Sequence, residues 1–254
     1  MTMLARMTKS VFMSALGLAA LAGGEASASD GALSPADQAV VAIAAHTADG
    51  NLSALKADLN DGLEAGLTVN EIKEVLVQLY AYAGFPRSLN GIHTFMGVMD
   101  ERQAAGKSDP VGREPSPVPA DLDRDRYGAE MRAKLGGRAV IPPPSGYQLF
   151  APAIDAFLKE HLFCDIFIRD NLAHTRRELA TVGALAGMTG TAGQMVFHMN
   201  AAMNTGVSAS EMKSLVQVIR TECGSDRADA AEAVLERVLR DREQKAKASS
   251  GSRR

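Results

Sequence analysis

The chain of 254 residues contains an internal repeat, and this repeat constrains its fold more than any other feature. Residues 38–87 align with residues 178–227 at a constant offset of 140. The residue is the same in both copies at these positions: Ala44/Ala184, Gly50/Gly190, Asn60/Asn200, Gly66/Gly206, Glu71/Glu211, Lys73/Lys213, Gly84/Gly224 and Arg87/Arg227. Several of the shared glycines follow apolar periodic runs, where a glycine can adopt the left-handed conformation that ends a helix. The repeat therefore predicts two related helical units.

A helix start recurs at the same place in both copies. Thr68 and Glu71 form one capping box, and Ser208 and Glu211 form the other. Each box opens a run in which apolar residues recur every three or four positions, as on one face of a helix. No segment of any length alternates apolar and polar residues as a strand does. We predict an all-α protein in which each copy contains a helix, a short break, a second helix, a glycine stop and a capped third helix.

Composition divides the chain after its N-terminal segment into four parts. The first unit spans residues 29–105 and the second unit spans 150–240. Between them, residues 106–149 hold seven of the ten prolines, which predicts a stiff connector with one short helix near 121–135. The polar tail at 241–254 is expected to be disordered.

Residues 1–28 have the pattern of a secretory signal peptide. Arg6 and Lys9 precede an uncharged apolar run at 11–22, and Ala-Ser-Ala at 26–28 is a small-residue cleavage site. The apolar run is shorter than the roughly 20 residues that span a bilayer, although a membrane-anchored N-terminus is the alternative. We therefore expect a periplasmic or secreted protein that does not associate with a membrane after cleavage.

The remaining chain is slightly acidic and contains two cysteines. Cleavage would leave 25 basic and 29 acidic residues, which lacks the basic excess of a nucleic-acid-binding protein. An oxidising compartment permits a disulfide between Cys164 and Cys223, but their spacing matches no metal or redox motif. Two free cysteines are the alternative.

The second copy contains two polar residues in otherwise apolar helical runs, Glu178 and His198. They belong to consecutive helices joined by a glycine-containing break, and two antiparallel helices would bring them together. A buried carboxylate beside an imidazole can move a proton on and off a substrate near neutral pH. The alternative is structural: Glu178 would complement the helix dipole or pair with arginine, and His198 would be an ordinary core histidine.

The sequence of these segments resembles a known family. RRELATVGALA and HMNAAMNTGVSASEMK in the second copy, and LNDGLEAGLTVNEIKEVLVQLYAYAGFPR in the first, are similar to the carboxymuconolactone decarboxylase family, which includes the AhpD-like alkylhydroperoxidases. The resemblance covers about residues 37–100 and 150–240. It implies two tandem AhpD-like helical units and an oligomer, such as a trimer of two-copy chains that mimics a hexamer of single units.

In the peroxidase branch of this family a glutamate is followed by a Cys-x-x-Cys pair and then a histidine. The cysteine positions would fall near Thr191 and Gln194, and neither is a cysteine. Peroxide reduction by a thiol would therefore lack its nucleophile. The resemblance instead implies that Glu178 and His198 do acid–base chemistry without a metal or cofactor, with His198 as proton donor and Glu178 orienting it or protonating the substrate.

The first copy lacks this pair, because Gln38 and Asp58 stand at the equivalent positions. We expect it to be degenerate and to close the site or fill a place in the assembly.

Four further residues are candidates for substrate binding: Tyr82, Arg87, His93 and His174. Arg87 can bind a carboxylate through its planar guanidinium, although an intrachain salt bridge is the alternative. His174 lies one helical turn before Glu178, so His174, Glu178 and His198 also form a conceivable but weak metal-ligand set.

The function that we expect is decarboxylation or isomerisation of a small carboxylated lactone or enol by an exported, homo-oligomeric enzyme. Two alternatives stay open. One is a non-catalytic oligomerising or binding protein of the same fold, and the other is an antioxidant protein related to peroxide metabolism. The substrate is not determined by the motif.

Overall fold

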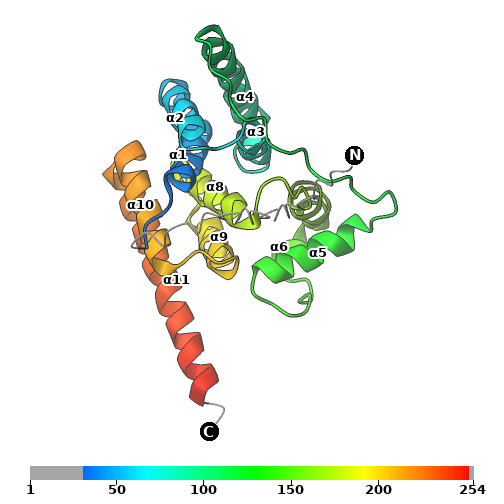
Figure 1. Cartoon of the computed structure of the whole chain (residues 1–254). Coiled ribbons are helices and arrows are strands. Elements are labelled where there is room, and N and C mark those ends of the chain that lie inside the picture. Colours follow the sequence, from blue (N-terminus) through cyan, green and yellow to red (C-terminus); the bar gives the residue numbers. More distant parts are fainter. Residues whose placement is uncertain (1–30, 252–254) are drawn as a thin grey trace, which may run out of the picture.

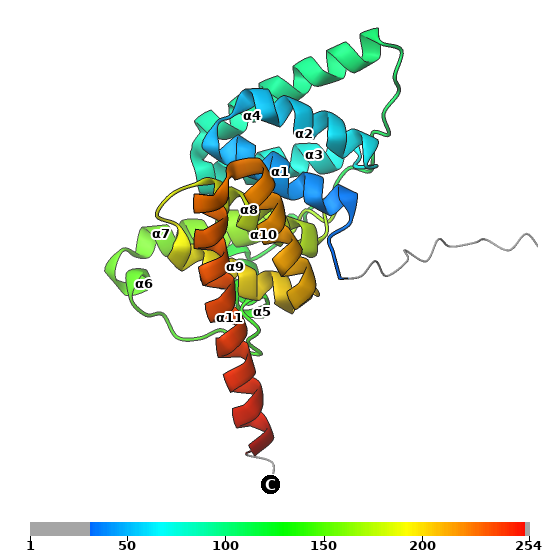
Figure 2. The ribbon, with the colours of Figure 1, turned by 90° about the vertical axis from the view of Figure 1, so that its left-hand side faces the viewer.

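The computed structural model describes residues 31–251, so the predicted signal peptide lies outside the described residues. Within this range every regular element is a helix, which confirms the all-α prediction (Figures 1 and 2). No helix in the described range is long and apolar enough to cross a membrane.

The repeat found in the sequence is also present in the structure. The helices of the first unit are α1 (Pro35–Asp49), α2 (Leu52–Glu64), α3 (Val69–Gln78) and α4 (Tyr80–Ala104). At the offset of 140, those of the second unit are α8 (His174–Gly187), α9 (Ala192–Asn204), α10 (Ala209–Cys223) and α11 (Ser225–Gly251). Both predicted capping boxes are formed, one at the start of α3 and one at the start of α10.

Three pairs of equivalent glycines adopt positive φ and divide the two units at the same points. The φ values are 82° and 79° at Gly50 and Gly190, 93° and 119° at Gly66 and Gly206, and 82° and 88° at Gly84 and Gly224. Gly224 separates the capped helix α10 from the long helix α11, and Gly84 is a non-helical residue near the start of α4, after which the long part of α4 begins. Each unit therefore has four helices, one more than the sequence predicted.

The two units join where α1 crosses α8 at the centre of the molecule. The crossing is close because α8 carries Gly183 and Gly187 where it meets α1. A Cβ atom built on Gly183 would lie 2.7 Å from the carbonyl oxygen of Val41, and one built on Gly187 would lie 2.5 Å from that of Ala45. The apolar faces of all the repeat helices share one continuous core around this crossing.

The connector between the two units contains helices of its own. It contains α5 (Arg124–Leu135), close to the predicted short helix, and α6 (Tyr147–Phe150), and leads into α7 (Pro152–Ala156) and a π-helix, η1 (Phe157–Ile166). α5 packs directly on η1, since a Cβ at Gly128 would lie well inside contact distance of the Lys159 carbonyl oxygen. α5, η1 and α9 enclose a second, smaller apolar core (Figure 1).

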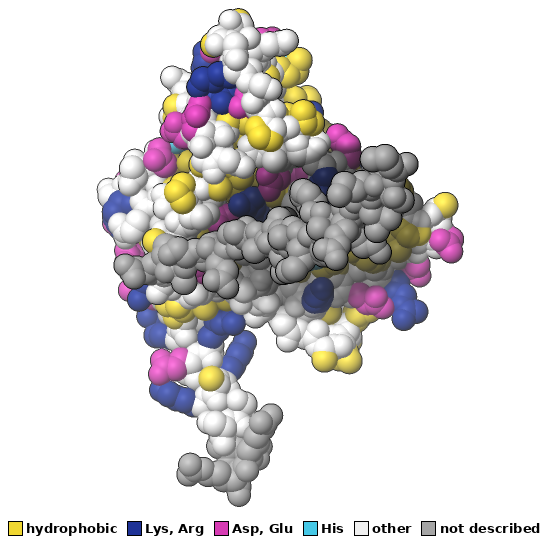
Figure 3. Space-filling model, viewed as in Figure 1, with side chains coloured by type: hydrophobic (Ala, Val, Ile, Leu, Met, Phe, Trp, Pro, Cys, Tyr) yellow, Lys and Arg dark blue, Asp and Glu magenta, His cyan; other side chains and the backbone are white. Residues whose placement is uncertain are grey.

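The prediction of a disordered tail at 241–254 is wrong for the described part of it. Helix α11 continues to Gly251 and its end projects from the body of the protein (Figure 2). Charged side chains cover much of this end on the face shown in Figure 3. Ion pairs one turn apart, such as Arg240–Glu236 and Lys247–Glu243, contribute to the stability of this polar helical segment.

A buried polar network also ties the two units together. Arg177 of α8 is fully buried and donates to Glu74 (3.0 Å) and to the side-chain oxygen of Gln78 (3.1 Å), both on α3. Arg169 donates to the same Glu74 carboxylate. Burial alone would raise the pKa of Glu74, but the hydrogen bonds from Arg169 and Arg177 hold it below its ordinary value.

We predict that Gly187→Ala destabilises the protein by about 1–3 kcal/mol, because the added methyl group would push α1 away from α8. Gly97→Ala is the matched control, since Gly97 lies in helix α4 and a Cβ there has no neighbour within 4 Å. The control should be neutral or slightly stabilising. Chemical denaturation measures both variants, and equal stability of the two would contradict the close crossing.

Replacing the carboxylate of Glu74 should change how stability depends on pH. The lowered pKa of Glu74 in the folded protein means that its stabilisation is present above the ordinary glutamate range, about pH 4.3, and is lost as the pH falls through and below that range. Glu74→Gln should cost about 3 kcal/mol at pH 7, because it leaves buried Arg177 without its anion.

The difference between wild type and Glu74→Gln should therefore narrow in acid when unfolding is followed from pH 7 to pH 3. Glu101→Gln is the control, because Glu101 pairs with Lys56 on the exposed surface and should have little effect at either pH. A difference that stays constant over this range would refute the assigned role of Glu74.

Candidate functional site

Glu178 and His198 form a buried hydrogen-bonded pair, as the antiparallel arrangement of α8 and α9 predicted. The His198 Nδ1 atom lies 2.7 Å from Glu178 Oε2. Glu178 is 0% exposed and His198 is 5% exposed. A carboxylate at Nδ1 favours the tautomer with a proton on that nitrogen, which leaves Nε2 on the opposite side of the ring for a ligand.

His198 lines a cavity of about 620 Å³, whereas Glu178 lies behind it and does not line the cavity. The cavity wall is mainly apolar and comes from the first unit, the connector, the π-helix and the second unit: Ala81, Tyr82, Arg132, Tyr147, Leu158, Leu162, Phe163, Leu185, Met188, Gly190, Thr191, Gly193, Gln194, Phe197 and His198. This size is within the range of small-molecule sites. The side chain that can contact a ligand in this pair is therefore His198.

The aromatic rings of Tyr82 and Phe197 hold the His198 ring edge-on, with centroid distances of 5.4 and 5.1 Å. The Tyr82 hydroxyl and Glu178 Oε1 are both buried and have no hydrogen-bond partner in the described part of the chain. Burial and, secondarily, the Glu178 carboxylate raise the pKa of Tyr82, so its hydroxyl stays protonated. Glu178 Oε1 is therefore an additional hydrogen-bond acceptor beside His198, and the Tyr82 hydroxyl is a nearby donor.

The four residues predicted to bind substrate have different locations. Tyr82 lines the cavity, but Arg87, His93 and His174 do not. Arg87 and His93 are exposed on α4, and the Arg87 guanidinium packs against Gly50. The His174 Nε2 atom lies 2.9 Å from the carbonyl oxygen of Phe167, and among the described residues His174 is in neither group of side chains whose ligand atoms lie close enough to share a metal ion. These three assignments are wrong for the cavity of this chain.

The cationic residue in the cavity is Arg132 of the connector helix α5, which the sequence did not single out. Its Nη1 atom donates to Asp155 (2.6 Å), and its Nε and Nη2 atoms make no hydrogen bond within the described residues. Tyr147 from α6 lies beside it, with its hydroxyl 3.5 Å from Nη1. The sequence predicted a short helix near 121–135 within a proline-rich spacer, and it did not indicate that this helix contributes to a site.

Thr191 and Gln194, the positions implied for a redox pair, both line the cavity. Neither cysteine of the chain is among the lining residues, and Cys164 and Cys223 are both free rather than disulfide-bonded. A thiol nucleophile is therefore lacking in this cavity.

The first unit has a buried histidine–carboxylate pair of its own, which the sequence comparison missed. His46 Nδ1 lies 2.6 Å from Asp58, the residue at the place of His198, while Gln38 stands at the place of Glu178. In the first unit the histidine is on α1 and the acid on α2, whereas in the second unit the acid is on α8 and the histidine on α9. The hydrogen bond to Asp58, with a smaller contribution from Cys223, raises the pKa of His46 to about 11.

Comparison with known proteins gives one family. The model of the carboxymuconolactone decarboxylase family matches residues 15–94 and 152–237, one segment in each unit, and the chain belongs to this family. Residues 15–28 of the first match are also part of the predicted signal peptide, and export stays a prediction. No curated protein matches the chain.

Proposed function

We propose that this member of the carboxymuconolactone decarboxylase family catalyses decarboxylation or isomerisation of a small carboxylated lactone or enol. The observation that carries the proposal is a hydrogen-bonded Glu178–His198 pair that presents only the imidazole to a cavity of about 620 Å³. Such a pair supports proton transfer to or from a substrate carbon or oxygen atom. The proposal needs no cofactor.

The cavity wall suits a small anionic substrate. Arg132 offers two guanidinium nitrogens that have no partner among the described residues, and a planar guanidinium binds carboxylates well. The apolar wall around it, which includes Leu158, Leu162 and Phe163, limits access of water and strengthens the interaction of opposite charges.

In the proposed mechanism Arg132 anchors a substrate carboxylate that is retained, and His198 Nε2 acts on the reacting atom. Loss of CO2 from a β-keto-type acid leaves an enolate; the imidazolium form of His198 gives its Nε2 proton to the enolate carbon to form C–H, and Nε2 then regains a proton from solvent. Glu178 accepts the Nδ1 hydrogen bond throughout and stabilises the imidazolium state. In an isomerisation the same nitrogen would remove a proton and return it to a different atom of the substrate.

We also propose that the enzyme is exported and acts as a homo-oligomer. The support for export is the pattern of residues 1–28. The support for assembly is a set of exposed apolar side chains on α4 and around α6 and η1: Phe85, Leu89, Met96, Leu149, Phe150 and Phe157.

The test is turnover by the purified protein of a panel of carboxymuconolactones and of their monomethyl esters at the carboxylate that is not lost, followed by loss of substrate absorbance. His198→Ala should lower kcat by about 100-fold or more, because it removes the proton donor. Glu178→Gln should lower kcat with little change in KM. The substitution removes the carboxylate that holds His198 Nδ1, whereas Glu178 itself does not line the cavity that binds the substrate. Arg132→Gln should raise KM for the acid and leave that for the ester unchanged.

His93→Gln is the control, because His93 is an exposed histidine outside the cavity. Circular dichroism shows whether each variant is folded. Turnover that survives in folded His198→Ala would exclude the proposed chemistry. Absence of turnover by the wild type on the whole panel would favour the non-catalytic binding protein.

A further inference from the structure

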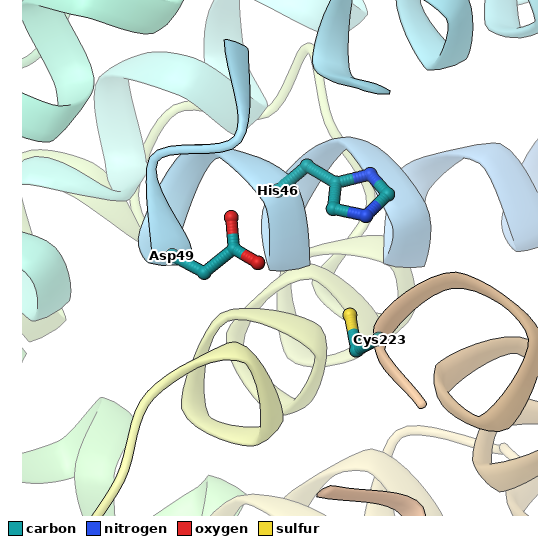
Figure 4. A group of neighbouring side chains, drawn as sticks. All are labelled: His46, Asp49 and Cys223. Atoms are coloured by element: carbon teal, nitrogen blue, oxygen red, sulfur yellow. The ribbon is translucent and has the colours of Figure 1, made fainter. Parts of the chain in front are cut away.

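A second cluster of reactive side chains lies far from His198 in the chain, where the end of α1 meets the end of α10. It consists of His46 and Asp49 from the last turn of α1 and Cys223, the last residue of α10. One ligand atom from each residue lies within 4.8 Å of the others. Figure 4 shows the three side chains around a common space, with the sulfur of Cys223 directed toward the His46 ring.

We propose that His46, Asp49 and Cys223 bind a zinc-like divalent transition-metal ion. An imidazole, a thiolate and a carboxylate form a donor set suited to zinc and unsuited to magnesium or calcium, which prefer oxygen ligands. Three protein ligands leave a fourth position for water or another ligand. This site is independent of the function proposed for the His198 cavity.

The hydrogen bonds of His46 orient it for this role. Nδ1 lies 2.6 Å from Asp58, whereas Nε2 faces the end of α10, 3.1 Å from the carbonyl oxygen of Glu222. In protein metal sites a carboxylate commonly holds the non-ligating nitrogen of a histidine in this way, which fixes the ring and the tautomer. Asp58 is therefore the orienting residue, and Nε2 is the ligand atom.

The electrostatic surroundings favour a cation. Two helices end at this point, and the C-terminus of each carries a partial negative charge. Asp58 and Glu222 add carboxylates that also lie within 4.8 Å of His46. These charges oppose an isolated thiolate, so a metal ion rather than a reactive free thiol is the species that the cluster accommodates.

Two arginine side chains lie close to this cluster. Arg227 pairs with Asp49 (3.2 Å) and donates to the Gly187 carbonyl oxygen, and Arg87 lies against Gly50. A metal ion would take over the Asp49 carboxylate from Arg227. The ion would bind the Nε2 atom of His46 and the thiolate of Cys223, so its binding would be coupled to the release of protons.

Sequence alone gives no sign of this site, because its histidine and cysteine are 177 positions apart. The ligands come from both units, with α1 in the first and α10 in the second. A bound ion would link the two units near the α1–α8 crossing, so it should raise the thermal unfolding temperature.

The experiment is titration of the purified protein with Co²⁺, which reports thiolate ligation through a near-ultraviolet charge-transfer band. We expect one ion per chain, displacement by Zn²⁺, and loss of the band in Cys223→Ser but not in Cys164→Ala. His46→Gln should weaken binding at least about tenfold, whereas His93→Gln, at an exposed histidine, should not. A band of equal strength in Cys223→Ser, or no band in the wild type, would overturn the proposal.

A second measurement needs no variant. Zn²⁺ should slow alkylation of the half-buried Cys223 in the wild type at least about tenfold, and a chelator should restore the rate. Peptide mapping assigns the modified cysteine. An alkylation rate at Cys223 that zinc does not change would also overturn the site.

Discussion

The close crossing of α1 and α8 is the interaction on which the rest of the structure depends. Gly183 and Gly187 let the backbones approach so closely that a methyl group at either position would meet a carbonyl oxygen of α1. Burial on both sides of this crossing makes the two units one hydrophobic core rather than two. Helix α8 also carries Glu178 and Arg177, so the same crossing sets the position of the buried carboxylate and of the ionic network.

The cavity lined by His198 belongs to no single unit. His198 and its supporting Glu178 come from the second unit, Tyr82 comes from the first, and Arg132 comes from the connector. This arrangement explains how the first unit can lose the Glu178–His198 pair and still be needed for the site. Both units hold an imidazole against a carboxylate, but the histidine is on the first helix of the first unit and on the second helix of the second unit.

Local features of the sequence predicted much of this structure. The helix ends at glycines 50, 66 and 84 and at their equivalents could be predicted, because glycine is the residue that most readily adopts the positive φ that ends a helix. The two capping boxes predicted two helix starts. The pairing of Glu178 with His198 followed from two antiparallel neighbours in the chain.

Features that depend on distant contacts could not be predicted in this way. Arg132 reaches the cavity because Gly128 lets α5 pack against the backbone of η1, a contact across the connector that no local pattern records. The choice of Arg87 failed for the same reason: its guanidinium lies against Gly50, outside the cavity wall. The His46–Asp58 pair was hidden because the two residue types have exchanged helices.

The measurement that tests the central claim most directly is the ¹⁵N NMR spectrum of the His198 ring, recorded with and without a small carboxylated lactone. The account predicts a protonated Nδ1 whose hydrogen-bonded proton signal is lost in Glu178→Gln, and an Nε2 resonance that shifts when the lactone binds. An Nε2 resonance unchanged by a bound lactone, or a proton absent from Nδ1, would contradict it.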